Sequence, residues 1–192
     1  MKIVFATSNP NKKIEIQSML PQHFEIINLE DIGFFDEIPE TEPTIAENAI
    51  QKANFITEKF GLDCFADDTG LEVEALHGEP GVFSARYAGA QCDSNDNIDK
   101  LLENLDKQPN RKARFRTVIC LNFKGRQYLF EGIVNGTITN EKTGTGGFGY
   151  DPVFCPNGFD QTFAELPLTV KNKISHRGIA TQQLIDFLSK TI

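Results

Sequence analysis

Two adjacent carboxylates, Asp67 and Asp68, stand where the apolar run Cys64–Ala66 meets Thr69-Gly70. Like charges that crowd into a poorly solvated place disfavour ionisation, and one of them tends to have a raised pKa. A metal ion or a reaction that uses the pair would offset that cost. The run Cys64–Ala66 predicts a short strand that ends at the pair. The alternative is a turn in which one aspartate accepts bonds from backbone amides, which accounts for one carboxylate more easily than for two.

Further carboxylates upstream could share a cation with the pair: Glu40 and Glu42 in a polar loop, and Glu47 in a predicted helix. Mg²⁺ prefers hard oxygen ligands and needs only one or two protein carboxylates when waters and phosphates complete its shell. Glu47 also completes a capping box with Thr44, so a purely structural role for it stays open, as does a solvated Glu42.

The segment from Thr7 to Lys13 follows a predicted buried strand, Lys2–Ala6, and precedes a predicted helix, Lys12–Leu20. Backbone N–H groups and the helix dipole favour an anion at such a junction. Lys12 and Lys13 are unfavourable at a helix N-terminus unless an anion lies nearby. The alternative is an ordinary cap with solvated lysines.

A glycine-rich segment, GTGGFGYDPVF, spans residues 144–154. Its glycines allow a close backbone approach to a ligand, and a ring of Phe148 or Tyr150 that the loop leaves uncovered could stack on a flat ligand. Asp151 could then accept hydrogen bonds from a base edge. The segment is not a P-loop, because no Gly-Lys-Ser/Thr follows, and a tight turn with aromatic packing is the alternative.

Basic residues gather in the segment KNKISHRG, around a helix predicted to begin near Ser175; they are Lys171, Lys173, His176 and Arg177. Arg86, after the turn at Pro80-Gly81, is a further candidate phosphate contact. A solvated basic helix end is the alternative for the first group.

The remaining elements define the fold class. Apolar periodicity predicts helices over residues 44–60 and 95–105 and strands over 24–29, 113–123, 126–133 and 152–154, with a hairpin turn at Lys124-Gly125. This order predicts an α/β protein, with a mixed sheet flanked by helices in one domain over residues 1–192.

The composition argues against several classes of function. The net charge of −8 over 192 residues argues against general nucleic-acid binding, which needs a basic face. The four cysteines lie far apart with no C-x-x-C pair, so zinc and thioredoxin-like chemistry are poor interpretations. The N-terminal apolar run is too short for a signal peptide and no run reaches the length of a membrane span, so we expect a cytoplasmic protein without a membrane partner.

In this order the motifs resemble those of the noncanonical purine nucleoside triphosphate pyrophosphatases, also called inosine/xanthosine triphosphate pyrophosphatases or XTP/dITP diphosphatases. The resemblance covers nearly the whole chain and rests on T-x-N-x-x-K from Thr7, Glu40-Thr41 with Glu47-Asn48-Ala49, ADDTGLEVEALHGEPGVFSARYAG, GTGGFGYDPVF and KNKISHRG. It departs from the family at Pro43, where glycine is common, and at residues 167–170, where a more acidic run is usual.

The resemblance implies hydrolysis of ITP, dITP and XTP to the monophosphate and pyrophosphate with Mg²⁺, in an elongated fold of two lobes around a central cleft, usually as a homodimer. It implies Asp68 as proton acceptor and Glu40 with Asp68 as metal ligands. The substrate-binding residues it implies are Thr7, Ser8, Asn9, Pro10, Asn11, Lys12, Thr69, Phe148, Gly149, Tyr150, Asp151, Lys171, His176 and Arg177. The role of Asp67, in orienting water or a second metal, stays open.

The chemistry of the base agrees with that implication. A 6-oxo purine presents an acceptor where adenine presents a donor, so a cation aimed at that edge discriminates against adenine. Two other functions stay open: a pyrophosphatase for dTTP, UTP or modified pyrimidine triphosphates, and a nucleotide sensor without catalysis. The acidic pair argues against the sensor, because a pure binder of polyphosphate gains little from bare carboxylates.

Overall fold

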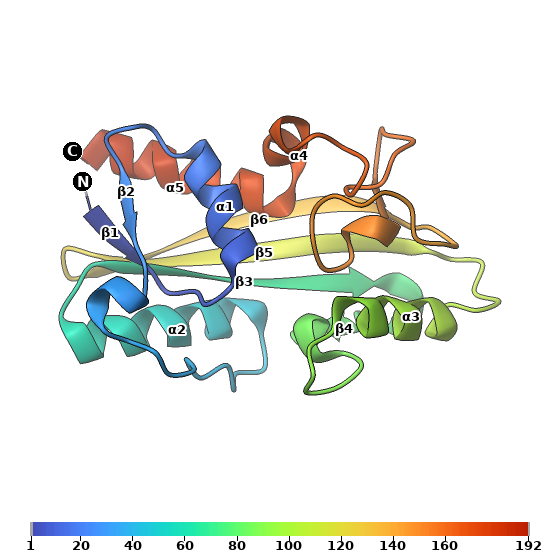
Figure 1. Cartoon of the computed structure of the whole chain (residues 1–192), viewed down its shortest axis with the longest axis horizontal. Helices are drawn as coiled ribbons and strands as arrows, with labels where there is room; N and C mark the ends of the chain where they lie inside the picture. The colour runs from blue at the N-terminus through green and yellow to red at the C-terminus, as the bar shows by residue number, and fades with distance from the viewer. Residues whose placement is uncertain (1, 192) are drawn as a thin grey trace. The chain divides into compact units, whose positions relative to one another are not determined.

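The computed structural model describes residues 2–191, and within them it shows one mixed sheet with the strand order β2-β1-β3-β5-β6-β7 and β4 paired to β3 (Figure 1). β1 is parallel to β2 and β3, whereas β4 and β7 are antiparallel to β3 and β6. The strands are β1 (Lys2–Phe5), β2 (Glu25–Ile27), β3 (Cys64–Val73), β4 (Pro80–Gly81), β5 (Lys112–Phe123), β6 (Arg126–Ile138) and β7 (Phe154–Pro156). The predicted mixed α/β class is confirmed.

Five α-helices accompany these strands in the described residues: α1 (Pro10–Met19), α2 (Ile45–Phe60), α3 (Ser94–Asn104), α4 (Leu168–Ile174) and α5 (His176–Thr191). Short 3₁₀ turns lie at Glu30–Ile32, Glu74–Leu76, Ser84–Arg86 and Asp151–Val153. None of the described helices is long and apolar enough to cross a membrane.

The chain forms two compact units. Unit 1 comprises Met1–Asp68, Thr117–Gly132 and Arg177–Ile192, and unit 2 comprises Thr69–Arg116 and Ile133–His176. Two units agree in number with the two predicted lobes, while the central cleft stays a prediction. The predicted site residues are divided, because Asp68 and Arg177 belong to unit 1 and Thr69 and His176 to unit 2.

In unit 1, helices cover both faces of the sheet (Figure 1). Alternate strand residues, such as Phe5 on β1 and Phe65 on β3, pack with Ile16 of α1 and Leu184 of α5 in one apolar cluster. Helix α2 lies on the opposite face (Figure 1). Because successive strand residues point to opposite faces, the parity of a position in β3 decides which helices its side chain meets.

Local sequence signals explain the ends of several elements. Thr44 caps α2 by accepting a bond from the Glu47 amide at 3.2 Å, and its hydroxyl donates to the Glu47 carboxylate at 2.6 Å. The turn between β5 and β6 has positive φ at both Lys124 and Gly125, +49° and +75°, as a two-residue hairpin requires. The predicted capping box and hairpin are thus confirmed.

Unit 2 has its own apolar core, built from the outer parts of β3, β5 and β6 with α3 and the aromatic residues Phe115, Phe154 and Phe163. Tyr150 belongs to this core, and its hydroxyl donates to the backbone carbonyl of Ser84 at 2.8 Å. This bond connects the glycine-rich segment to the turn that carries Arg86.

Two predictions of local structure were wrong. β3 does not end before the acidic pair but continues through it to Val73, as a strand between β1 and β5 whose last part also pairs with β4. Basic residues Lys171 and Lys173 do not lie at a helix start but in the last turn of α4, a separate short helix where cations are favourable.

Candidate active site

The acidic pair lies inside strand β3, so its two side chains point to opposite faces of the sheet. Asp67 has the parity of Phe65 and lies on the face of α1 and α5, while Asp68 lies on the face of α2. Both are buried, with 1% and 7% of their surface exposed. Two adjacent carboxylates therefore occupy two different environments.

Asp67 is held by two cations. The Lys12 ammonium lies 3.0 Å from Oδ1, and the Arg177 guanidinium donates to Oδ2 at 3.1 Å. The other side of Arg177 donates to the Glu15 carboxylate at 2.6 Å, so this guanidinium bridges two buried acids. Burial opposes ionisation of Asp67, but Lys12 and Arg177 outweigh it and lower its pKa well below the ordinary range. Asp67 is a fixed anion in this arrangement.

Asp68 shares one cation with a second carboxylate. The Lys52 ammonium of α2 lies 2.5 Å from Glu40 Oε1 and 3.4 Å from Asp68 Oδ1. Burial raises the pKa of Asp68, and the attraction of Lys52 and Lys12 does not reverse the shift, because Glu40 and Asp67 also act against ionisation. For Glu40, burial is outweighed by Lys52, and its pKa is lowered.

The charges of this network explain why Asp68 differs. Its ion pairs join the cations Lys12, Lys52 and Arg177 to the carboxylates Glu15, Glu40, Asp67 and Asp68. Of these contacts, the one between Lys52 and Asp68 is the longest, at 3.4 Å. Burial is the main cause of the raised pKa of Asp68, and the neighbouring charges of Glu40 and Asp67 add to it.

The residues present fit a Mg²⁺ ion. Asp68 Oδ2 is buried and has no hydrogen-bond partner among the described residues. An oxygen in that condition is costly unless a cation or a water contacts it. Glu40 lies on the other side of the same ammonium, with 36% of its side chain exposed. Two carboxylates are the number that Mg²⁺ uses when phosphates supply other ligands.

The Thr7–Lys12 segment differs from its prediction in one respect. The side chain of Asn9 accepts bonds from the amides of Asn11 and Lys12, at 2.9 and 3.3 Å, and Pro10 has no N–H. The backbone amides that we expected to bind an anion therefore already donate hydrogen bonds within the chain. The anion expected beside Lys12 is found, and it is Asp67. Phosphate binding by this segment stays a prediction that rests on side chains.

Unit 2 holds the other predicted group. Asp151 is 3% exposed, and its Oδ2 accepts from the Phe148 amide at 2.8 Å and from the Lys171 ammonium at 2.6 Å. The ammonium also lies 5.1 Å from the centre of the Phe148 ring. Phe148 remains partly exposed, whereas Tyr150 is buried. Of the two candidate rings, Phe148 is the one that can meet a ligand.

The glycines of this segment approach the protein itself. A Cβ on Gly147, whose φ is +68°, would lie 2.0 Å from Asp151 Oδ2, and one on Gly146 would lie 2.8 Å from the carbonyl oxygen of Ala164. Glycine at these positions therefore lets the loop close over Asp151 and Ala164. Gly149 has open space where a side chain would be, with φ +60°.

The ring of His176 is stacked on Phe115, with centroids 4.4 Å apart and planes 15° apart, and is 3% exposed. The turn that carries Arg86 is held by Ser84, whose hydroxyl accepts from the Leu71 amide at 2.9 Å and donates to Gly81 O at 2.6 Å. Thr69 follows Asp68 on β3 at an intermediate exposure. The structure thus places these residues on ordered elements of unit 2.

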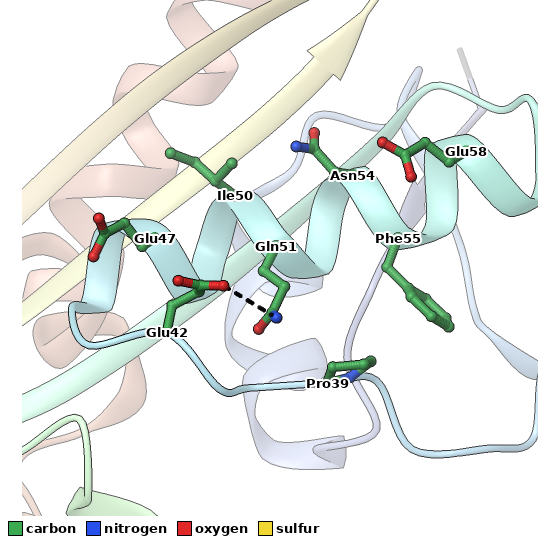
Figure 2. A pocket seen from close by; sticks show the side chains of 8 residues that line it. All are labelled: Pro39, Glu42, Glu47, Ile50, Gln51, Asn54, Phe55 and Glu58. Atoms are coloured by element: carbon green, nitrogen blue, oxygen red, sulfur yellow. Dashed lines mark hydrogen bonds between the residues drawn. The ribbon is translucent and has the colours of Figure 1, made fainter.

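A pocket of about 400 Å³ runs along α2 and is lined by two of the candidate carboxylates, Glu42 and Glu47, but not by Glu40 or Asp68 (Figure 2). Three carboxylates line it, those of Glu42, Glu47 and Glu58, together with Phe55 and Gln51. Its negative charge is unsuited to a triphosphate.

Sequence reasoning missed two members of the network, Lys52 and Glu15. Glu15 is buried on α1 while its apolar neighbour Ile14 is 57% exposed, the reverse of the expected stripe. Lys52 lies within the expected apolar stripe of α2 and is 4% exposed. A lysine within an apolar stripe was a usable signal for a buried ion pair; the partner of Glu15 lies 162 positions away and left no local signal.

Comparison with known proteins assigns the family. A model of the Ham1 family matches residues 3–187. A protein of Flavobacterium johnsoniae named dITP/XTP pyrophosphatase is 62% identical over 191 residues, which cover 100% of both chains, and one of Porphyromonas gingivalis with the same name is 53% identical over 97% of each. The Ham1 protein of Staphylococcus aureus superposes with a TM-score of 0.89 at 39% identity and full coverage of both chains, and that of Coxiella burnetii with 0.91 at 38% and 99%. The chain described here belongs to the Ham1 family.

Proposed function

We propose that this protein hydrolyses noncanonical purine nucleoside triphosphates, namely ITP, dITP and XTP, to the nucleoside monophosphate and pyrophosphate, and so removes them from the nucleotide pool. The names of its close relatives support the substrate class. The observation that carries the chemistry is the asymmetry of the acidic pair: Asp67 contacts two cations, while Asp68 keeps a buried oxygen that has no hydrogen-bond partner among residues 2–191.

Asp68 is the proposed general base. A water molecule attacks the α-phosphorus, its proton passes to the Asp68 carboxylate, and the bond from the α-phosphorus to the bridging oxygen breaks to release pyrophosphate. A raised pKa makes Asp68 a better proton acceptor than Asp67, whose pKa is lowered. Asp67 is therefore assigned to holding Lys12 and Arg177 in place, which resolves its role within this proposal.

Glu40 and Asp68 would hold Mg²⁺, which would neutralise phosphate charge and favour the departure of pyrophosphate. Lys52 keeps their two carboxylates close together before that charge arrives. Lys12 is also suited to the phosphates, because burial and its cationic neighbours lower its pKa, and an added anion would relieve both effects.

We assign stacking on the base to Phe148. Arg177 is 2% exposed and donates to two carboxylates, and Lys171 is 3% exposed and donates to Asp151, so contact of either cation with a base would require it to leave its carboxylate partners. Phe148 offers a partly exposed ring, which suits stacking on a flat base.

The test is a panel of ITP, dITP, XTP, GTP, ATP, dTTP and UTP, with pyrophosphate detection, in Mg²⁺ and in EDTA. We expect activity on the first three in Mg²⁺ only. Preference for UTP or dTTP would favour the pyrimidine alternative, and binding without turnover of any nucleotide would favour a sensor.

Asp68→Asn tests the base. It should lower turnover at least about 10²-fold and change nucleotide affinity less than about tenfold. Asp63→Asn is the matched control, because Asp63 lies in the same unit and bonds the Lys124 amide at 2.9 Å, and it should keep turnover within about threefold. Near-normal turnover in Asp68→Asn would remove Asp68 from this role.

A further inference from the structure

The loop that carries Glu40 is fastened to helix α2 by three side chains, one for each of three consecutive loop residues. Lys52 bonds the Glu40 carboxylate at 2.5 Å, Gln51 accepts from the Thr41 amide at 3.0 Å, and Asn48 accepts from the Glu42 amide at 2.9 Å. Positions 48, 51 and 52 share one face of a helix. The helix therefore presents a row of polar groups to this short stretch of loop.

Of the two carboxamide side chains that bond the loop, Asn48 is more buried than Gln51. Only 1% of its surface is exposed, and its Nδ2 donates to the Glu42 carbonyl at 3.2 Å while its Oδ1 accepts from the Glu42 amide. One carboxamide thus satisfies both backbone groups of Glu42, as a strand partner would. Gln51 acts in a similar way from a more exposed position, because its Nε2 donates to the Thr41 hydroxyl at 2.8 Å. The same Nε2 donates to the Glu42 carboxylate at 3.4 Å (Figure 2).

From this geometry we infer that Asn48 is a positioning residue for the proposed metal carboxylate Glu40, an inference that rests on the function proposed above. Glu40 has a partly exposed side chain and would have to be ordered each time a cation binds if its loop were loose. Ordering a loose backbone costs conformational entropy, which would weaken cation binding. Asn48 fixes the loop two residues from Glu40 in advance, so it raises cation affinity without contacting the cation.

Asn48→Ala tests this inference, with Asn122→Ala as its matched control. Asn122 also bonds α2 through its carboxamide, at 2.9 Å to Asn54 and 3.2 Å to Thr57, but does not contact the Glu40 loop. Glu40→Gln provides the benchmark for loss of the carboxylate itself. Mn²⁺ binding to each variant is measured by water-proton relaxation, and the Mg²⁺ concentration for half-maximal turnover is measured in parallel.

We expect Asn48→Ala to raise both metal constants several-fold, up to the roughly 10-fold loss that follows removal of a direct partner of a metal ligand, with turnover at saturating Mg²⁺ reduced less than about threefold. Asn122→Ala should lower thermal stability and leave both constants within about twofold. Asn48→Asp, which keeps an acceptor for the Glu42 amide but loses the donor, should fall between wild type and Asn48→Ala.

The outcomes separate the two levels of the proposal. If Glu40→Gln raises the metal constants and a folded Asn48→Ala does not, the positioning role of Asn48 is overturned while the metal role of Glu40 stands. If Glu40→Gln leaves both constants unchanged, the metal role of Glu40 fails and the inference fails with it. If Asn48→Ala does not fold, Asn48→Asp decides, and unchanged constants in that variant overturn the role.

Discussion

Replacing either acid of the pair by its uncharged isostere should change stability in opposite directions. In metal-free protein at pH 7, we expect Asp67→Asn to be destabilising and Asp68→Asn to be stabilising. The two changes remove one negative charge each from neighbouring positions of β3. The two variants leave different cations without a carboxylate partner. Opposite signs of the two stability changes would therefore report the different surroundings of the two acids.

The magnitude for Asp67 follows from its contacts. Asp67→Asn would leave the Lys12 ammonium and the Arg177 guanidinium buried with one carboxylate fewer. Removing one partner of a buried ion pair costs about 3–5 kcal/mol, and the remaining amide oxygen favours the lower end. In a chain of this size each kcal/mol changes the melting temperature by about 2–4 °C, so we expect a fall of about 6–12 °C.

For Asp68 the sign is reversed, because its carboxylate is buried beside the like charges of Glu40 and Asp67 and lies 3.4 Å from its cation. Asp68→Asn removes that charge and keeps an oxygen that can accept from Lys52. Single stabilising substitutions commonly contribute about 0.5–2 kcal/mol, and those at an active site often reduce activity. We expect the melting temperature to rise by about 1–8 °C while catalysis is lost.

The pH dependence supplies a second check. The native pKa of Asp67 is lowered, so its stabilisation is complete above its ordinary pKa and declines only as the pH falls below about 4. The native pKa of Asp68 is raised, so wild type loses stability as the pH rises through that pKa. The advantage of Asp68→Asn should therefore grow as the pH rises from about 4 through the raised pKa of Asp68 and then level off, whereas the deficit of Asp67→Asn should stay constant above about pH 4.

The assay is thermal unfolding followed by circular dichroism in EDTA, from pH 4 to 8, for wild type and both variants. Equal destabilisation by the two variants would refute the assignment of different environments. A larger loss for Asp68→Asn than for Asp67→Asn would show that Asp68, not Asp67, is the anion that holds the surrounding cations.

Three further predictions test other parts of the site. Lys52→Met should leave two carboxylates without their shared cation, and we expect turnover to fall at least about 10²-fold and the pKa of Asp68, followed by NMR, to rise further. Glu15→Gln removes one of the two acids on Arg177, and we expect a melting temperature about 4–12 °C lower, with unchanged stability counting against the bridge. Phe148→Leu should raise KM for ITP by about 5–20-fold and leave kcat within about threefold, and a change in kcat alone would exclude a stacking role.

Local patterns predicted the elements whose ends carry chemical signals. The capping box at Thr44 and Glu47 and the hairpin turn at Lys124-Gly125 depend on neighbours in sequence, and both are present. Helix α4 was missed because seven residues between Pro167 and Ser175 are too few to show a helical period. Capping and turn signals involve only residues close in sequence, so they predict the ends of elements but not contacts between distant segments.

The site was predicted in part for the same reason. The residue types pointed to a metal and an anion near Asp68, but their partners come from distant segments. Arg177 reaches Glu15 across 162 positions and Asp67 across 110. Nothing in the local pattern predicted that β3 continues through residues 67–70, since aspartate and glycine are poor strand formers. The position of β3 between β1 and β5 in the sheet overrides that preference.

Placing the acids side by side in a strand achieves what a turn could not. Neighbouring strand positions lie about 3.3 Å apart along the chain yet point to opposite faces, so one backbone segment fixes both carboxylates rigidly while their surroundings stay separate. Asp67 meets cations from α1 and α5, and Asp68 meets a cation from α2. In a turn, both side chains would share one environment, and a cation close enough to hold the first would also reach the second. The strand thus allows one acid to bind cations permanently and its neighbour to keep an oxygen available for catalysis.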